Sequence, residues 1–176
     1  MRKPIALVAF ALSAVLFVGT APALAAGRTT ESVPAHVGVP VEGICGFTAF
    51  VTQRDPRTLT TWTDRQGKIV LQTLRTTTTT EYSGGPGGVM QLDENSLLTI
   101  KPNTDGTSTL LFVGRGAIWG TDTTLGQSFF QWVTGVVLMR GTFDMKSGSF
   151  LVSSKTILGQ STDLCDSLTT GLKPRH

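Results

Sequence analysis

The chain has 176 residues, with 15 Lys and Arg, 12 Asp and Glu and 2 His, and its formal net charge is +3. Arg2 and Lys3 lie in an N-terminal segment that we predict is removed, and the 13 basic residues left nearly balance the 12 acidic ones. These basic residues are scattered singly along the chain. The sequence therefore argues against nucleic acid and against an anionic membrane surface as partners.

The N-terminal segment has the pattern of a secretory signal peptide. Its two basic residues precede an uncharged apolar run over residues 4–18, and alanines at positions 23 and 25 precede Ala26. Because signal peptidase accepts only small side chains at the −3 and −1 positions, we expect residues 1–25 to be lost. A membrane anchor is the alternative, but glycine and proline interrupt the end of the apolar stretch and no stop-transfer segment follows. We expect a secreted, extracellular protein with no membrane attachment once the signal is removed.

Composition divides the processed chain into three regions. Residues 26–43 combine proline, glycine and polar residues and are predicted to form an extended N-terminal arm. Residues 44–168 are predicted to form one domain, and residues 169–176 a C-terminal tail. Threonine makes up 27 of the 151 residues after position 25. Its branched, stiff side chain favours strands over helices.

Cys45 and Cys165 are the two cysteines of the chain. In an exported protein an even number of cysteines normally forms disulfides, so we expect one bridge between them. Such a bridge would tie the first strand to the chain just after the last one, and in the chain-entropy model it contributes roughly 4–5 kcal/mol. A zinc or redox site is disfavoured because there is no Cys-x-x-Cys motif and His36 and His176 are the only histidines that could assist.

Short β-rich runs fill the domain, separated by turn signals, without helical periodicity longer than a turn or two. The predicted strands cover residues 47–52, 58–63, 68–74, 76–81, 89–92, 97–101, 107–113, 129–133, 136–140 and 149–153. Several turns between them combine Asp or Asn with Gly, as hairpin turns do. The sequence therefore predicts an all-β antiparallel meander that closes into a small β-barrel, with a two-sheet β-sandwich as the alternative.

The predicted core consists of apolar residues whose neighbours in the chain are polar or small. They are Phe47, Trp62, Ile69, Leu71, Leu98, Ile100, Leu111, Val113, Ile118, Trp132, Val137, Phe150 and Val152. Trp119 and Phe143 lie beside glycines, where a large aromatic side chain either plugs a bend or lines a ligand site. With Trp132, they are our candidates for ligand-facing residues.

Four local features suggest a chemical role but lack the residues or the context that the role needs. The glycine-rich residues 83–88 have no Lys-Ser/Thr pair and are interpreted as a flexible connection rather than a phosphate loop. Asp93 and Glu94 are interpreted as part of a turn that ends with Asn95, and Tyr82 as an aromatic residue at the edge of the core. In the threonine run 76–80, an edge or solvent-facing strand is favoured over an ice-binding ladder.

Catalytic groups are likewise scattered. A histidine-dependent hydrolase is disfavoured because His36 lies in the predicted arm and His176 is the last residue of the sequence. The remaining polar candidates for a site at a barrel mouth are Asp122, Asp144, Asp163, Arg115 and Arg140, which nothing in the sequence brings together. We identify no catalytic residue, cofactor site or metal site, and we expect a protein that is not an enzyme.

A resemblance rests on the two cysteines and several turns. The residues that carry it are Ile44 to Phe47, Gln66 to Lys68, Asp105 to Thr107, Gly114, Gly116, Ile118, Trp119, Gly135 and Asp163 to Leu168. In these the chain resembles a broad group of uncharacterised secreted actinobacterial β-rich proteins with one N-terminal and one C-terminal cysteine. The resemblance implies a compact β domain with a bridge, and it brings no activity.

Two functional hypotheses remain. The first is a non-catalytic binding or interaction protein that uses a barrel mouth or an exposed strand edge, with an unknown ligand or partner. The second is a small barrel carrier or enzyme that acts on an apolar small molecule. Aromatic residues motivate the second: Phe112, Trp119, Phe129, Phe130, Trp132 and Phe143. A cavity lined by aromatic side chains and a few polar groups would favour the carrier.

Overall fold

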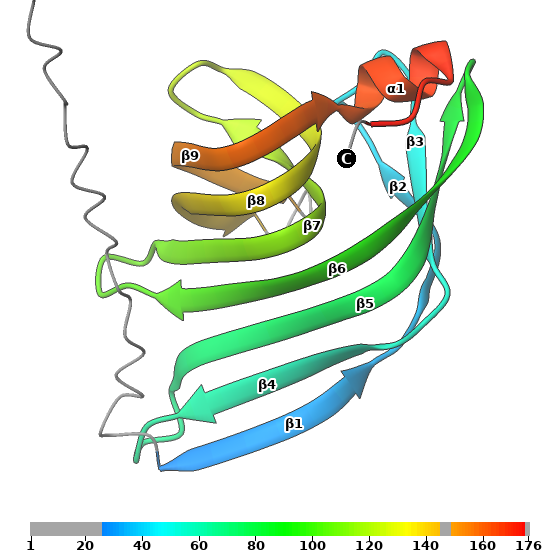
Figure 1. Ribbon diagram of the computed structural model, residues 1–176. Coiled ribbons are helices and arrows are strands. Elements are labelled where there is room, and N and C mark those ends of the chain that lie inside the picture. The colour runs from blue at the N-terminus through cyan, green and yellow to red at the C-terminus, as the bar shows by residue number, and fades with distance from the viewer. Residues whose placement is uncertain (1–25, 145–148, 175–176) are drawn as a thin grey trace, which may run out of the picture.

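The computed structural model describes residues 26–144 and 149–174 (Figure 1). The predicted signal peptide, residues 1–25, lies outside the described residues. The described chain forms a nine-stranded sheet and one short helix. In chain order the elements are β1 (Gly27–Val33), β2 (His36–Val41), β3 (Ala49–Gln53), β4 (Arg57–Thr63), β5 (Ile69–Gly85), β6 (Gly88–Pro102), β7 (Ser108–Asp122), β8 (Gln127–Asp144), β9 (Ser149–Asp163) and α1 (Leu164–Thr170).

The sheet is a meander from β4 to β9, in which each strand pairs antiparallel with the next. β1 adds to β4 at one edge, while β3 pairs with the far end of β5 and carries β2 on its outer side. At the other edge the end of β7 also pairs in parallel with β9, and the sheet curls tightly there (Figure 1). The all-β prediction is confirmed. The sheet is strongly curved but is not closed into a barrel, and its nine strands belong to one sheet rather than to the two of a sandwich.

The predicted arm, residues 26–43, contributes two strands to the sheet. β1 pairs along its whole length with β4, and β2 pairs with β3 after a register shift near His36. Both are edge strands, where a proline such as Pro40 is tolerated because the N–H that it lacks has no ladder partner to serve. The predicted tail begins within α1, which runs to Thr170 and ends at Gly171 in the left-handed conformation.

Several predicted strands merge into longer ones. β5 has 17 residues and β8 has 18, and each joins two predicted runs. The predicted turn at residues 93–95 is wrong, because these residues lie inside β6, where Asp93 and Asn95 pair with Thr79 and Thr77 of β5. Asp93 and Asn95 lie on the solvent-facing side of this strand. β5 as a whole is paired on both sides, but its pairing with β4 reaches Arg75 and its pairing with β3 begins at Thr80, so Thr76 to Thr79 have one described neighbour, β6. Thr77 and Thr79 are exposed, in agreement with a solvent-facing strand.

A row of three glycines bends the curled edge of the sheet. Gly135 of β8 pairs with Gly114 of β7 on one side and with Gly159 of β9 on the other. Their φ angles are 123°, 142° and 135° for Gly114, Gly135 and Gly159, a backbone conformation that side chains oppose. A Cβ at Gly135 would lie 2.2 Å from the carbonyl oxygen of Leu158. Only glycine therefore allows the neighbouring backbones to approach at this bend.

Two apolar clusters fill the inside of the curved sheet. The first, which we call the helix-covered core, contains Val41, Ala49, Val51, Tyr82, Met90, Leu92, Phe130, Trp132, Leu164 and Leu168. The second, which we call the cavity core, contains Leu110, Phe112, Ile118, Phe129, Val133, Val137, Met139, Phe150 and Val152.

The predicted core agrees with these clusters in part. Ile118, Trp132, Val137, Phe150 and Val152 are buried, and six further members are half-buried: Phe47, Trp62, Leu71, Leu98, Ile100 and Leu111. Ile69 and Val113 are exposed instead. Both lie in runs where consecutive residues are apolar, so alternation does not reveal which face of the strand turns inward.

Helix α1 covers the first core, and three features fix it there. Cys45 and Cys165 form the expected disulfide, with their Cα atoms 5.4 Å apart. Asp163 caps the helix by accepting hydrogen bonds from two backbone N–H groups of its first turn. The glycine-rich residues 83–88, predicted to be a flexible connection, instead end β5, form a tight turn at residues 86–87 and begin β6. Gly85 and Gly87 pack against Leu168 of the helix. The N–H of Gly87 donates to the carbonyl of Leu168 at 2.7 Å.

Candidate functional site

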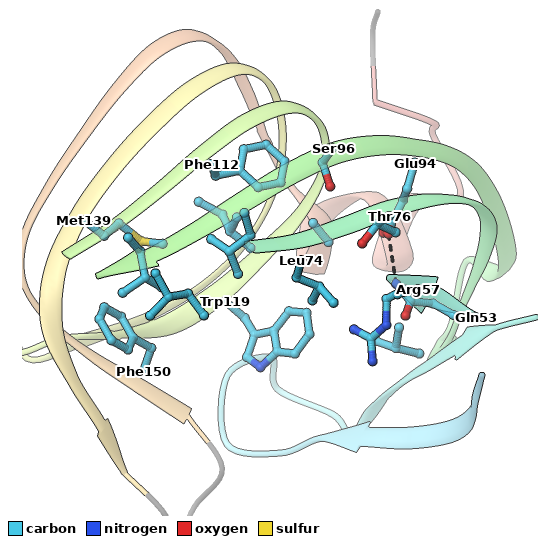
Figure 2. Close-up of a pocket in the computed structure, with 16 residues that line it drawn as sticks. Gln53, Arg57, Leu74, Thr76, Glu94, Ser96, Phe112, Trp119, Met139 and Phe150 are labelled. Atoms are coloured by element: carbon cyan, nitrogen blue, oxygen red, sulfur yellow. Dashed lines mark hydrogen bonds between the residues drawn. The ribbon is translucent and has the colours of Figure 1, made fainter. Parts of the chain in front are cut away.

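A cavity of about 250 Å³ opens inside the curve of the sheet (Figure 2). Its walls come from every strand between β3 and β9, so residues distant in the sequence meet there. The lining residues are Val51, Gln53, Arg57, Leu74, Thr76, Glu94, Ser96, Leu98, Ile100, Leu110, Phe112, Ala117, Ile118, Trp119, Met139 and Phe150. Strand alternation explains why β6 contributes four of these residues, since residues 94, 96, 98 and 100 share one face of the strand.

One end of the cavity is apolar. Phe112, Met139 and Phe150 are all at least nine-tenths buried and form its wall together with aliphatic residues of β6 and β7. Trp119 is 36% exposed and stands at the rim, where its ring packs edge-on against Phe130 at a centroid distance of 6.1 Å. The apolar end therefore offers a small molecule a largely preformed surface.

The other end is polar and centres on Glu94. This carboxyl is 6% exposed, and its oxygens accept hydrogen bonds from the hydroxyl of Tyr82 and from Nε2 of Gln53, the latter at 2.9 Å. Burial raises the pKa of Glu94, and these hydrogen bonds partly oppose the increase. Burial, together with the carboxyl beside it, raises the pKa of Tyr82 well above 10, so its hydroxyl remains a donor.

Arg57, the first residue of β4, brings a cation to the same end of the cavity (Figure 2). Its guanidinium contacts the Nε2 atom of His36 in β2. Partial burial lowers the pKa of Arg57, and the charge of Glu94 acts in the opposite direction. Burial and the neighbouring guanidinium lower the pKa of His36 as well, which favours a neutral ring that accepts a hydrogen bond from Arg57.

The three candidate ligand-facing residues have different positions. Trp119 lines the cavity. Trp132 does not line it: it is 1% exposed within the helix-covered core, where its ring packs edge-on against Tyr82. It shares this core with Leu164 and Leu168 of α1. Phe143 pairs with Phe150 between β8 and β9, and its side chain lies outside the described part of the structure.

The polar candidates from the sequence do not converge. Asp163 caps α1, and Asp122 accepts hydrogen bonds from the backbone N–H groups of residues 124 and 125 in a turn. Asp144 lies at the end of β8, where side chains are not described, and Arg115 lies opposite Asn95 of β6. None of these residues is among those that line the cavity.

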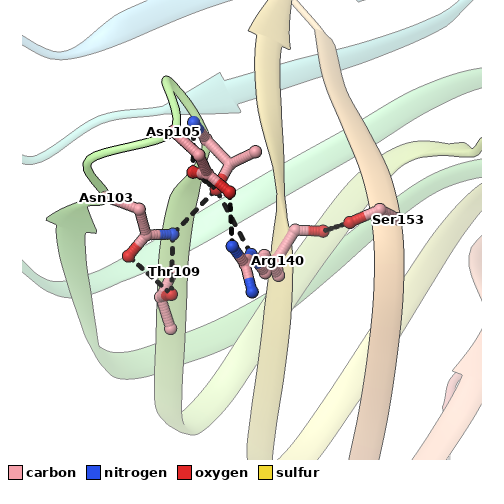
Figure 3. Close-up of polar contacts among 6 residues, drawn as sticks. Asn103, Asp105, Thr109, Arg140 and Ser153 are labelled. Atoms are coloured by element: carbon pink, nitrogen blue, oxygen red, sulfur yellow. Dashed lines mark hydrogen bonds and ion pairs between the residues drawn. The ribbon is translucent and has the colours of Figure 1, made fainter.

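Arg140 belongs to a separate polar group on the surface (Figure 3). It forms an ion pair with Asp105 in the turn between β6 and β7. Hydrogen bonds from the side chain and backbone of Thr107, followed by Arg140, lower the pKa of Asp105 to about 2. Asn103 and Thr109 complete the group at 3.2 Å. Because each member has a partner within the turn, the group stabilises this hairpin and offers no open site.

Sequence reasoning missed Glu94 and Arg57. Glu94 was assigned to a turn, and the signal that would have found it is the alternation Glu94, Ser96, Leu98, Ile100 on one strand face. Arg57 was assigned no role, and its position depends on the pairing of β1, β2 and β3 around the start of β4. Such pairing between distant segments leaves no local pattern in the sequence.

The chain was compared with protein-family models, curated protein sequences and solved structures, and none of the three comparisons found a match. Within residues 26–144 and 149–174, no cluster of His, Cys, Asp and Glu is arranged to hold a metal ion. The helix in this part of the chain is also too short and too polar to cross a membrane. The cavity is therefore the feature from which a function can be argued.

Proposed function

We propose that this protein is an exported, non-catalytic binding protein that holds a small, largely apolar molecule in the cavity. The observation that carries the proposal is the apolar wall of Phe112, Met139 and Phe150, which faces about 250 Å³ of open space inside the sheet. Small-molecule sites are typically concave and apolar, with a few placed polar groups. The disulfide between Cys45 and Cys165 is compatible with work in an oxidising compartment.

A carrier is supported over an enzyme by the state of the polar groups. The carboxyl of Glu94 is occupied by hydrogen bonds from Tyr82 and Gln53, so its oxygens serve the protein itself. Among the described residues, neither His36 nor Arg57 is paired with a nucleophile, and each contacts the other. Catalysis by an activated nucleophile requires such a pair within hydrogen-bond distance.

Binding is tested with aminonaphthalene, a small fluorophore whose emission rises in an apolar site. Two neighbouring leucines of β6 provide matched variants, because both are half-buried and only Leu98 lines the cavity. We expect saturable binding to the natural protein, loss of at least tenfold in affinity for Leu98→Trp, which fills the cavity, and little change for Leu97→Trp. No saturable binding, or equal loss in both folded variants, would contradict the proposal.

A further inference from the structure

The charge at the polar end of the cavity is incompletely balanced. Arg57 is half-buried, and its Nε atom is shielded from solvent without a hydrogen-bond partner among the described residues. The ion pairs found in residues 26–144 and 149–174 are Arg54–Glu81 and Arg140–Asp105. Arg57 therefore has no carboxylate oxygen within ion-pair distance in this part of the chain.

Glu94 is the acidic group that acts on Arg57, but its oxygens are used elsewhere. They accept from Tyr82 and Gln53. His36, the direct partner of the guanidinium, is an uncharged acceptor when its ring is neutral. This contact orients Arg57 and leaves most of its five N–H donors without a described protein partner.

A half-buried cation with no carboxylate of the described residues within ion-pair distance is costly, because burial removes hydration that the contact with His36 replaces only in part. An anion from outside the chain would restore that interaction, and the planar guanidinium fork matches a carboxylate with two parallel hydrogen bonds. Burial favours the neutral form of Glu94, which reduces its repulsion of an anionic ligand.

We propose that the ligand is a small amphipathic carboxylic acid, whose carboxylate pairs with Arg57 and whose apolar part lies against Phe112, Met139 and Phe150. This inference rests on the proposed binding function and specifies its ligand class. The volume limits the ligand's size. A cavity of about 150 Å³ accommodates benzene, so about 250 Å³ accommodates a ligand with on the order of ten non-hydrogen atoms.

Octanoate and octanamide test this inference, because they have the same chain and nearly the same shape and differ in charge. We expect calorimetry at neutral pH to show octanoate binding roughly 10- to 100-fold more tightly than octanamide, the range expected for a charge-assisted hydrogen bond. Arg57→Gln should abolish this preference while octanamide still binds. Arg54→Gln, at an exposed neighbouring arginine, should preserve it.

The possible failures are distinguishable. Equal affinities of the natural protein for octanoate and octanamide would overturn the carboxylate inference and leave the binding function intact. If neither compound nor aminonaphthalene binds, the binding function itself fails. Should Arg57→Gln not fold, Arg57→Lys retains the charge without the planar fork, and we expect it to keep a reduced preference for octanoate; an undiminished preference would contradict pairing through the fork.

Discussion

The two cores lie inside the same curved sheet, yet one is filled and the other is open. The helix-covered core is closed by Leu164 and Leu168 of α1, and the disulfide holds that helix in place. The cavity core has no helix above it among the described residues, and Trp119 stands at its rim with 36% of its surface exposed. A half-open sheet thus gains stability at one end and retains space for a ligand at the other.

The boundary between the two cores is polar. Tyr82 belongs to the helix-covered core, whereas Glu94, to which it donates a hydrogen bond, lines the cavity. Buried polar groups of this kind are stable only when their partners are all present. Variants can therefore disturb the helix-covered core, the glycine row or this polar boundary, and we expect a different loss of unfolding free energy for each.

The largest effect on stability is expected at the disulfide that holds α1 over the helix-covered core. Cys45→Ser and Cys165→Ser should each lower the free energy of unfolding by about 2–5 kcal/mol, because either change opens the cross-linked loop. The double variant should cost little more, since the bond is lost only once. Urea unfolding measures all three. Costs of the two single variants that add up in the double variant would show that the cysteines act independently of the bond.

The stability of the protein should be nearly as sensitive to a change in the glycine row Gly114, Gly135 and Gly159, which bends the curled edge of the sheet. Gly135→Ala adds a Cβ that lies 2.2 Å from the oxygen of Leu158, and it does so at a φ of 142°. We expect a loss of about 2–4 kcal/mol from strain and overpacking combined. Gly106→Ala is the matched control, because φ is also positive there but no atom lies within 4 Å. Thermal unfolding that gives equal losses for the two variants would contradict a role for close backbone approach.

The smallest effect on stability is expected at Glu94, on the polar boundary between the two cores, and it depends on pH. Burial raises the pKa of Glu94 above 4.5 in the folded protein, so folding favours the protonated form. The free energy of unfolding should then fall as pH rises above 4.5, until the folded-state pKa is passed. Glu94→Gln cannot ionise, so its free energy of unfolding should rise relative to that of the natural protein over this range, by about 1.4 kcal/mol for each unit of pKa shift.

Urea unfolding of both proteins at a series of pH values measures this difference. Glu31→Gln is the control, because it removes an exposed carboxyl from the edge strand β1. A difference between Glu94→Gln and the natural protein that stays constant with pH would show that Glu94 is solvated as well in the folded state as in the unfolded chain.

The sequence predicted the strands and the disulfide better than the shape of the sheet. Strand propensity, hairpin turns and the cysteine count are local signals, and they correctly indicated an all-β meander and the Cys45–Cys165 bond. The sheet does not close into the predicted barrel, because closure depends on how far the sheet curves. That curvature arises where glycines from three strands align, as Gly114, Gly135 and Gly159 do.

The cavity was only partly predictable for the same reason. Trp119 is a candidate from the sequence because it lies beside a glycine, and it does line the cavity. Trp132, between Gln131 and Val133, faces the helix-covered core instead. The role of Glu94 is not recognisable from the sequence, because its neighbours Asp93 and Asn95 resemble a turn. In the structure these neighbours lie on the solvent-facing side of β6. The direction in which a side chain points depends on pairing with distant strands, which a single sequence does not record.

The disulfide also bears on the order in which the fold assembles. Most strand pairs of the meander join neighbours in the chain through short turns, and hairpins of this type form within microseconds. The bond instead joins residues separated by 120 positions, and disulfide formation takes seconds to hours. The hairpins from β5 to β9 can therefore form before the cysteines meet. In that order of events, the covalent bond fixes α1 over a sheet that has already formed. The bond then stabilises the folded state and does not direct the pairing of the strands.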